Sequence, residues 1–238
     1  MIGLKSIIDI HSHILPGVDD GASVLSEYLD MIDIYKAQNV EAVICTPHFG
    51  PCGYPGADVP GVFTQCSSQT DSFGLFLGNE ILYTDSTLTD LRNKSAITLN
   101  GTDYILVEFD EWKTYHVEKA FLVESLLKLA QSEYKPVLAH AERYEAVQYD
   151  LDICQFLSEH GVLLQVNAYD LFEQKKESCR NAAQWLAKNR LITFIGSDCH
   201  GYHRPPNLLS GVNWLYNNVP EEYADAVVHG NAKKLLGI

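Results

Sequence analysis

Histidines, aspartates and glutamates recur along this chain just after apolar runs, and they are the residues best suited to chemistry. His11 and His13 follow the apolar run 6–10. A β-strand sends alternate side chains to one face, so an H-x-H pair at a strand end directs both imidazoles at one point. The other residues of this kind stand after later runs and are His48, Glu80, Glu108, His140, Asp198 and His200. Imidazole and carboxylate donors gathered at one rim are what divalent metals bind, so the pattern predicts a metal-dependent hydrolase.

The types of donor narrow the choice of metal. No cysteine belongs to the set, which disfavours a closed structural zinc site and suits Mn, Fe or catalytic Zn. Glu80 and Glu108 would repel each other as close unpaired carboxylates, whereas metal charge between them makes the pair favourable. Clustered divalent ions also lower the pKa of bound water and hold the attacking and leaving oxygens of a displacement.

The elements that position these residues alternate between strand-like and helix-like patterns. Such alternation is typical of βαβ units with a parallel sheet. We predict strands at 6–10, 42–45, 73–77, 104–107, 136–139, 162–166 and 191–197. We predict helices at 22–38 with Ser23 as N-cap, and at 117–134, 151–159, 171–188, 206–217, 221–228 and 231–236 with Asn231 as cap.

One stretch, Phe49–Ser72, breaks this alternation because Gly, Pro, Ser and Gln dominate it. A short helix or an ordered loop is expected there rather than a full crossover helix. Seven strands whose C-terminal ends carry ligand-type residues favour a distorted barrel, since barrel enzymes build their sites on that rim. An open doubly wound sheet is the alternative, but such sheets concentrate chemistry at one crevice. Asn167 also follows a strand and is expected to orient its neighbours.

Composition limits the remaining possibilities. At 238 residues and 46% hydrophobic content, the chain is predicted to form a single domain over 1–238, without a membrane span or a cleaved signal peptide. Six cysteines form no C-x-x-C pair, which indicates a reduced, cytoplasmic setting rather than a disulfide framework. A net charge of −14 without a basic stripe argues against a nucleic-acid partner.

The segment Asp9–Ala22, which reads D-I-H-S-H-I-L-P-G-V-D-D-G-A, combines with Thr46-Pro47-His48 and three later motifs into a specific pattern. Those motifs are Gly78-Asn79-Glu80, His140-Ala141-Glu142-Arg143-Tyr144 and Ser197-Asp198-x-His200. Together they resemble the polymerase-and-histidinol-phosphatase (PHP) superfamily. Within it, the chain is similar to the manganese-dependent tyrosine phosphatases of bacterial capsule and exopolysaccharide operons. The resemblance covers essentially the whole chain and is weakest after His48.

The resemblance implies a distorted (β/α)7 barrel that holds three divalent metals, with manganese preferred and iron or zinc as alternatives. One metal would take His11, His13, Glu80 and Asp198. Glu80 would bridge to a second metal that is completed by Glu108 and His140. A third metal would take Asp20, His48 and His200, with Asp20 preferred to Asp19 because the family aligns the carboxylate immediately before Gly21.

The resemblance also implies two phosphate-binding arginines, which match Arg143 and Arg204. A planar guanidinium suits phosphate oxygens, so arginines beside a metal cluster indicate phosphoryl transfer rather than amide hydrolysis. His200 or His140 would help to protonate the leaving tyrosyl oxygen, within the limits set by metal ligation. The implied substrate is a phosphotyrosine protein, namely the tyrosine-rich tail of a polysaccharide co-polymerase kinase. Homo-oligomerisation is left open.

Several alternatives stand beside these assignments. Arg143 could pair at the surface with Glu142 or Glu145, and Arg204 could be a surface charge of its loop. The substrate could instead be a small phosphate ester such as histidinol phosphate, or a phosphodiester. A third alternative is that the protein is not an enzyme and serves as a metal-stabilised module that binds a kinase. Phe49 and the helix-poor segment after it depart from the family and lie beside the predicted pocket. Three tyrosines are candidates to line a pocket for an aromatic leaving group: Tyr54, Tyr144 and Tyr202.

Cysteine-dependent phosphatase chemistry is excluded by the spacing of the motif that it needs. That chemistry uses a C-x5-R loop, and the arginine after Cys199 comes one residue too early, at Arg204. The nucleophile is therefore not expected to be a thiol.

Overall fold

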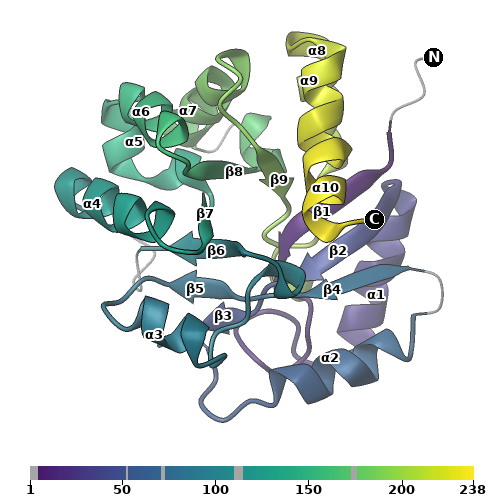
Figure 1. The fold of residues 1–238 in the computed structure, drawn as a ribbon. Coiled ribbons are helices and arrows are strands. Elements are labelled where there is room, and N and C mark those ends of the chain that lie inside the picture. The colour runs from purple at the N-terminus through teal and green to yellow at the C-terminus, as the bar shows by residue number, and fades with distance from the viewer. Residues whose placement is uncertain (1–4, 52, 71–72, 110–114, 173–175) are drawn as a thin grey trace.

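The computed structural model describes residues 5–51, 53–70, 73–109, 115–172 and 176–238. Parallel strands surround a common centre and helices cover them on the outside (Figure 1). One sheet has the order β1-β2-β4 and a longer one has the order β3-β5-β6-β7-β8-β9. A parallel bridge between Ser12 and Cys199 joins the first strand to the segment after the last. The fold is therefore an α/β fold whose parallel sheet curves into a partial barrel, as predicted.

The described residues form nine strands, which are all paired in parallel. Two of them are short strands that the sequence patterns did not predict. These begin at candidate ligands, His48 and Glu80. The strands are β1 (Ile7–Ser12), β2 (Val40–Cys45), β3 (His48–Phe49), β4 (Gly74–Leu77), β5 (Glu80–Leu82), β6 (Tyr104–Glu108), β7 (Lys135–Leu138), β8 (Leu163–Asn167) and β9 (Phe194–Gly196).

The helices cover the strands in most of the predicted places. They are α1 (Leu25–Ala37), α2 (Val59–Ser67), α3 (Thr87–Arg92), α4 (Lys119–Ala130), α5 (Glu145–Tyr149), α6 (Asp152–Glu159), α7 (Glu177–Lys188), α8 (Leu209–Asn218), α9 (Glu221–Asp225) and α10 (Asn231–Leu236). The short helix expected within Phe49–Ser72 is confirmed as α2. Asp58 caps this helix by accepting a hydrogen bond from the Gly61 amide.

Some predicted boundaries and caps are wrong. Helix α1 begins one turn later than predicted and its N-cap is Val24, while the Ser23 amide donates to Glu27 instead. Helix α7 was predicted from Leu171 but begins at Glu177. Leu171 instead ends a 3₁₀ turn, Ala168–Leu171, and residues 173–175 lie outside the described part. Asn231 continues a π-helical turn, Ala226–Gly230, so it is not a cap. Its side chain donates to the carbonyl of Thr193. The strand predicted over 191–197 is only Phe194–Gly196.

The inside of the barrel is filled by side chains from alternate strand positions. Ile8 and Ile10 of β1 pack with Val137 of β7 and with Phe194 of β9, and Leu235 of α10 closes the same cluster. The opposite faces of these strands pack against the helices in a second, larger cluster. The barrel interior is therefore a packed core, so chemistry can take place only at its rim.

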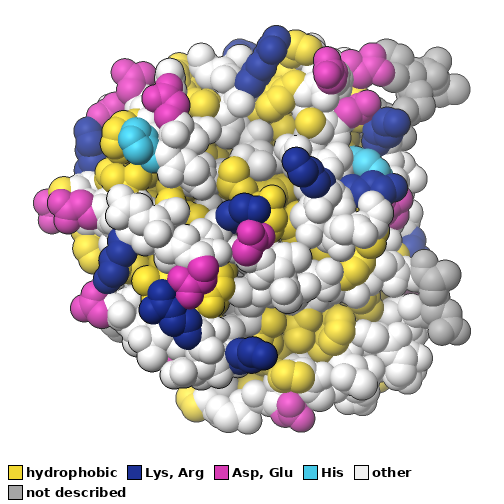
Figure 2. All heavy atoms as spheres, viewed as in Figure 1, with side chains coloured by type: hydrophobic (Ala, Val, Ile, Leu, Met, Phe, Trp, Pro, Cys, Tyr) yellow, Lys and Arg dark blue, Asp and Glu magenta, His cyan; other side chains and the backbone are white. Residues whose placement is uncertain are grey.

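The outer surface carries both signs of charge. On the face shown in Figure 2, acidic and basic side chains are interspersed with apolar ones, and the described residues of this face form no basic stripe. None of the described helices is long and apolar enough to cross a membrane.

Candidate metal centre

The rim residues converge because the backbone departs from regular geometry at three of them. Regular alternation would place His11 on the helix-facing side of β1, with Ile7 and Asp9. The register of β1 against β2 instead shifts between Asp9 and Ser12, as in a β-bulge, and the shift turns His11 and His13 toward the barrel axis. His140 and Asp198 have left-handed backbone conformations, with φ of 35° and 50°, which also re-aim their side chains. Such conformations are sparsely populated, and they mark functional positions in many folds.

Glu80 lies at the centre of the cluster. Its Oε1 atom lies 2.8 Å from Nε2 of His140 and 3.3 Å from Nε2 of His11. Its Oε2 atom lies 3.2 Å from Nε2 of His13 and 3.1 Å from Nδ1 of His48. Four imidazoles therefore surround one buried carboxylate, with two of them at each of its oxygens.

A second group of side chains lies around Asp20. Its Oδ1 atom lies 3.4 Å from Nε2 of His48 and 3.3 Å from Nε2 of His200. The neighbouring Asp19 has a different task, because its Oδ2 atom lies 2.7 Å from Nδ1 of His13 and accepts from the His48 amide. Asp20 thus faces the cluster, whereas Asp19 orients an imidazole from behind.

Every residue predicted to bind metal lies in this cluster. Four overlapping groups have ligand atoms that all lie within 4.8 Å of one another: His13, Asp20, His48 and His200; His11, His13 and Asp198; His11, Glu80 and His140; and His48, Glu80 and Glu108. The first contains the Asp20, His48 and His200 set implied by the resemblance, with His13 added. The second contains His11, His13 and Asp198 of another implied set without Glu80, and the third has Glu80 and His140 with His11 in place of Glu108. The fourth brings His48 to Glu108, so His48 lies between two of the implied sites.

The bonding of the buried donors fits divalent cations. Within the described part of the chain, both ring nitrogens of His48, Nδ1 of His140 and Oε1 of Glu108 are buried without a hydrogen-bond partner. The Nε2 atoms of His11 and His13 lie only 3.2 Å apart. Unsatisfied buried donors and acceptors are costly in a protein interior, whereas cations would satisfy the atoms that face the cluster.

A second layer of side chains fixes which nitrogen of each imidazole faces the cluster. Oε1 of Gln165 lies 3.0 Å from Nδ1 of His11 and accepts from the His140 amide at 2.8 Å. Gln165 Nε2 donates to Asn167, whose Nδ2 donates to Asp198 at 3.1 Å. The orienting role expected of Asn167 is therefore confirmed. Gln165 was missed, although its place two residues before Asn167 puts it on the same face of β8.

The two predicted arginines hold the two oxygens of Asp198. Arg143 Nη1 donates to Oδ2 at 2.9 Å, and Arg204 Nη2 donates to Oδ1 at 3.0 Å. Arg143 is buried and also donates to the hydroxyls of Tyr115 and Tyr169. The surface alternatives are wrong, because Arg143 pairs with Asp198 and Asp170 rather than with Glu142 or Glu145, and Arg204 belongs to the cluster.

The pKa directions agree with a cluster of ionised carboxylates and a neutral imidazole at His200. Burial raises the pKa of Asp198, but Arg204 and Arg143 outweigh it and hold that pKa well below its usual value. His11 and His48 do the same for Glu80. Burial, reinforced by His13, lowers the pKa of His200 to about 4. A neutral imidazole has a free lone pair, so His200 is in the state that binds metal.

Of the three tyrosines predicted to line a pocket, one lines a cavity beside the cluster and two do not. Tyr144 is fully buried, and its hydroxyl accepts from the Phe109 amide. Tyr202 bonds to Asp30 on the surface, so neither tyrosine lines a pocket at the cluster. Tyr54 does line a cavity, and His48 forms part of the same wall. Cys199 is buried, which raises the pKa of its thiol and agrees with the exclusion of thiol chemistry.

Comparison with known proteins identifies relatives over nearly the whole chain. A family described as "Capsular polysaccharide synthesis, CpsB/CapC" matches residues 7–237. The tyrosine-protein phosphatase CpsB of Streptococcus agalactiae serotype V is 28% identical over 245 residues, which cover 97% of this chain and 98% of that protein. Both sequence and length therefore match.

Solved structures give the same result. A structure described as one of YwqE from Bacillus subtilis and CpsB from Streptococcus pneumoniae, "unique metal-dependent tyrosine phosphatases", superposes with a TM-score of 0.87 at 26% identity, over 97% of this chain and 94% of the other. An inactive dihydroorotase-like domain from Chaetomium thermophilum superposes with a TM-score of 0.65 at 13% identity, over 99% of this chain and 80% of the other. This second match indicates the fold alone.

Proposed function

Because this chain belongs to the CpsB/CapC family of capsular polysaccharide synthesis proteins, we propose that it is a metal-dependent protein-tyrosine phosphatase. The observation that carries the proposal is the convergence of nine histidine, aspartate and glutamate side chains beside two arginines. Relatives over the full length are named tyrosine-protein phosphatases, which favours phosphotyrosine over a small ester such as histidinol phosphate. The chemistry does not depend on a cysteine.

The metal ligands are the nine residues of the cluster. We assign His11, His13, Glu80 and Asp198 to one ion, Glu80, Glu108 and His140 to a second, and Asp20, His48 and His200 to a third. When bound, divalent ions, manganese above iron or zinc, supply an activated water and neutralise charge on the phosphoryl oxygens. The donors are hard oxygens and imidazole nitrogens, which suit all three metals.

Arg143 and Arg204 bind the non-bridging oxygens of the phosphate. Each guanidinium is held by one oxygen of Asp198. Arg143 is held further by Tyr115 and Tyr169. The two guanidinium groups are therefore held in place before the substrate binds, so little reorganisation is needed when charge develops on the phosphoryl group.

His200, which the sequence also assigned to the catalytic set, acts as a ligand. A pKa of about 4 keeps this imidazole neutral at neutral pH, so it has no additional proton to give to the leaving oxygen, and its one N–H, on Nδ1, donates to the Asp198 carbonyl at 3.0 Å. Its Nδ1 atom lies 3.4 Å from Oδ1 of Asp198, and its Nε2 atom lies 3.3 Å from Oδ1 of Asp20. The imidazole thus joins the Asp20 group to the arginine-bound carboxylate.

The physiological substrate that we propose is the tyrosine-rich tail of a polysaccharide-regulating kinase. Family membership in capsular polysaccharide synthesis supports this assignment. A phosphoprotein of this kind presents its tail to a cytoplasmic enzyme, and we place the chain in that compartment.

The test compares hydrolysis of phosphotyrosine peptide, phosphoserine peptide and histidinol phosphate with manganese present. We expect phosphate release from the phosphotyrosine peptide, loss of activity after exhaustive chelation, and no effect of thiol alkylation. Arg143→Lys should lower kcat/KM by about tenfold or more, because lysine lacks the bidentate fork. Arg180→Lys on α7 is the matched control. Full activity after complete metal removal would refute the proposed chemistry.

A further inference from the structure

The Gly- and Pro-rich segment after His48 forms one wall of a cavity beside the metal centre. This cavity, which we call the flank pocket, has a volume of about 440 Å³ and is lined by Phe49, Tyr54, Pro55, Ala57, Pro60 and residues of the 94–97 connection. His48 lines both this cavity and the small polar hollow between the metal-binding side chains and the arginines. The two spaces therefore share a wall.

The wall of the flank pocket is held in place by its backbone. The amide of Gly53 donates to Gly50, and the amide of Tyr54 donates to Val18. A Cβ atom on Gly53 would lie 2.6 Å from the carbonyl oxygen of His48, so only glycine allows this close approach. The wall is thus tied directly to the strand that carries a candidate metal ligand.

The lining of the flank pocket is mainly apolar, with Asn79 and Ser95 among its polar members and one positive charge at the edge. Tyrosine, phenylalanine and proline are rigid and lose little conformational entropy when they bind a ligand. Tyr54 is 52% exposed although it is a large aromatic residue. A single exposed apolar residue is ordinary, but here Tyr54 lies in one cavity wall with Phe49 and Pro55, and contiguous apolar surface of this kind is typical of ligand-binding grooves.

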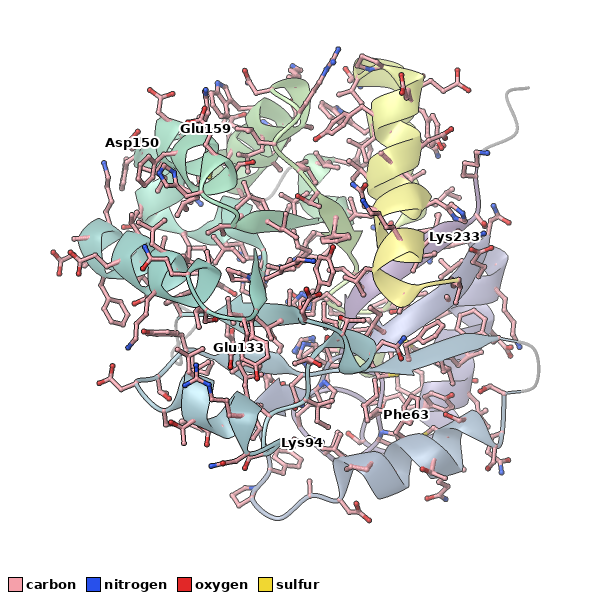
Figure 3. All side chains as sticks on the ribbon, in the orientation of Figure 1. Phe63, Lys94, Glu133, Asp150, Glu159 and Lys233 are labelled. Carbon is pink, nitrogen blue, oxygen red and sulfur yellow. The ribbon has the colours of Figure 1, made fainter. Side chains whose placement is uncertain are left out.

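Lys94 supplies the positive charge. It follows α3, where its amide donates to Leu91 and its backbone is left-handed, with a φ of 62°. No ion pair among the described residues involves Lys94, in a chain with a net charge of −14. It lies on the side of the molecule that carries α2 and α3 (Figure 3). A cation at the edge of an apolar cavity, with no ionic partner in the described part of the chain, is complementary to an apolar residue next to an acidic one.

From this complementarity we propose that the flank pocket binds the residues next to the phosphotyrosine of the substrate. A bulky aliphatic side chain enters the cavity, and the carboxylate of a neighbouring acidic residue pairs with Lys94. The inference rests on the proposed phosphatase function and adds a specificity site to it. Two other hollows, over 116–119 with 145–150 and over 118–124, share no side chain with the metal cluster and carry no such argument.

The test uses four phosphopeptides of equal length with one central phosphotyrosine. In each peptide the same two residues stand on either side of the phosphotyrosine. The four pairs are Leu with Glu, Leu with Gln, Ser with Glu, and Ser with Gln. The protein with manganese should prefer Leu to Ser by about tenfold in kcat/KM, as expected for burying one aliphatic side chain. It should prefer Glu to Gln by about two- to fivefold, and this preference should shrink with added salt, as for an exposed ion pair.

Variants separate the two contacts. Lys94→Gln should abolish the preference for Glu and keep that for Leu, while Lys233→Gln on α10 is its matched control (Figure 3). Tyr54→Ala should weaken the preference for Leu, with Tyr149→Ala, another exposed tyrosine, as control. Hydrolysis of para-nitrophenyl phosphate, which has no flanking residues, should stay unchanged in all four variants.

The outcomes distinguish the flank pocket from the phosphatase function itself. Equal rates on all four peptides, with turnover intact, would overturn the flank pocket and leave the phosphatase function standing. No turnover of any peptide or of para-nitrophenyl phosphate would overturn both. If Lys94→Gln lowered kcat/KM equally for para-nitrophenyl phosphate and for the peptides, the flank pocket would also be overturned, because Lys94 would then act on the phosphate.

Discussion

Replacing Gln165 by leucine tests whether the second layer sets the affinity of the metal cluster. The change keeps the size of the side chain but removes the oxygen that accepts from Nδ1 of His11 and from the amide of His140. It also removes the donor to Asn167. Because Gln165 is fully buried, water cannot replace these partners.

The size of the effect follows from the groups left unsatisfied. Each unpaired buried group costs about 1–3 kcal/mol. Two donors lose their acceptor and Oδ1 of Asn167 loses its donor, so the free energy of unfolding should fall by about 3–9 kcal/mol. His11 can relieve part of this cost by moving its proton to Nε2, but that nitrogen then cannot bind metal. We therefore expect the affinity for manganese to fall by about 10–100-fold, as for other residues that orient metal ligands.

The assay is isothermal titration of manganese into metal-free protein, together with thermal unfolding. Gln184→Leu is the matched control, because Gln184 donates only to the carbonyl of Leu171, away from the cluster. An unchanged manganese affinity in a folded Gln165→Leu variant would falsify the assignment of His11 and the role of Gln165 together. A loss of stability alone, with affinity intact, would reduce Gln165 to a structural residue.

Three further predictions concern the metals, an arginine contact and a surface ion pair. Exhaustive chelation should lower the Tm by about 5–10 °C relative to protein with manganese at about 100 times its Kd, which corresponds to about 2.7 kcal/mol; an identical Tm would argue against metal in the folded state. Tyr169→Phe removes a hydroxyl bonded to Arg143 and should raise the KM for phosphotyrosine peptide about tenfold, measured by steady-state kinetics, whereas an unchanged KM would exclude a role in holding the guanidinium. Arg92 holds the pKa of Glu133 at about 2 through their hydrogen bonds. The ionised carboxylate therefore stabilises the folded state at pH values above the pKa of glutamate in the unfolded chain, and this contribution is lost as the pH falls toward about 2. In Arg92→Gln the carboxyl should titrate near its ordinary value by NMR, and a pKa still near 2 would show that Arg92 is not the cause.

The chemistry of the site was readable from sequence because it depends on residue type and on position after a strand. His11, His13, Glu108 and Asp198 follow apolar runs, and the carboxyl ends of parallel strands meet at one rim. The alternation of patterns likewise predicted the parallel sheet and its covering helices. Short elements escaped prediction, since β3 has two residues and β5 has three, which is too little for any period to appear.

Tertiary structure alone decided how these side chains are aimed. Strand alternation by itself would turn His11 toward the helices, and only the shifted register of β1 against β2 directs it to the axis. The same holds for His140 and Asp198, whose left-handed backbones are stabilised by surrounding contacts rather than by local preference. Residue types are encoded locally, whereas bulges, strained dihedrals and second-layer partners such as Gln165 arise from contacts between distant segments. The sequence therefore determined which groups meet, and the packing of the barrel determined how they face one another.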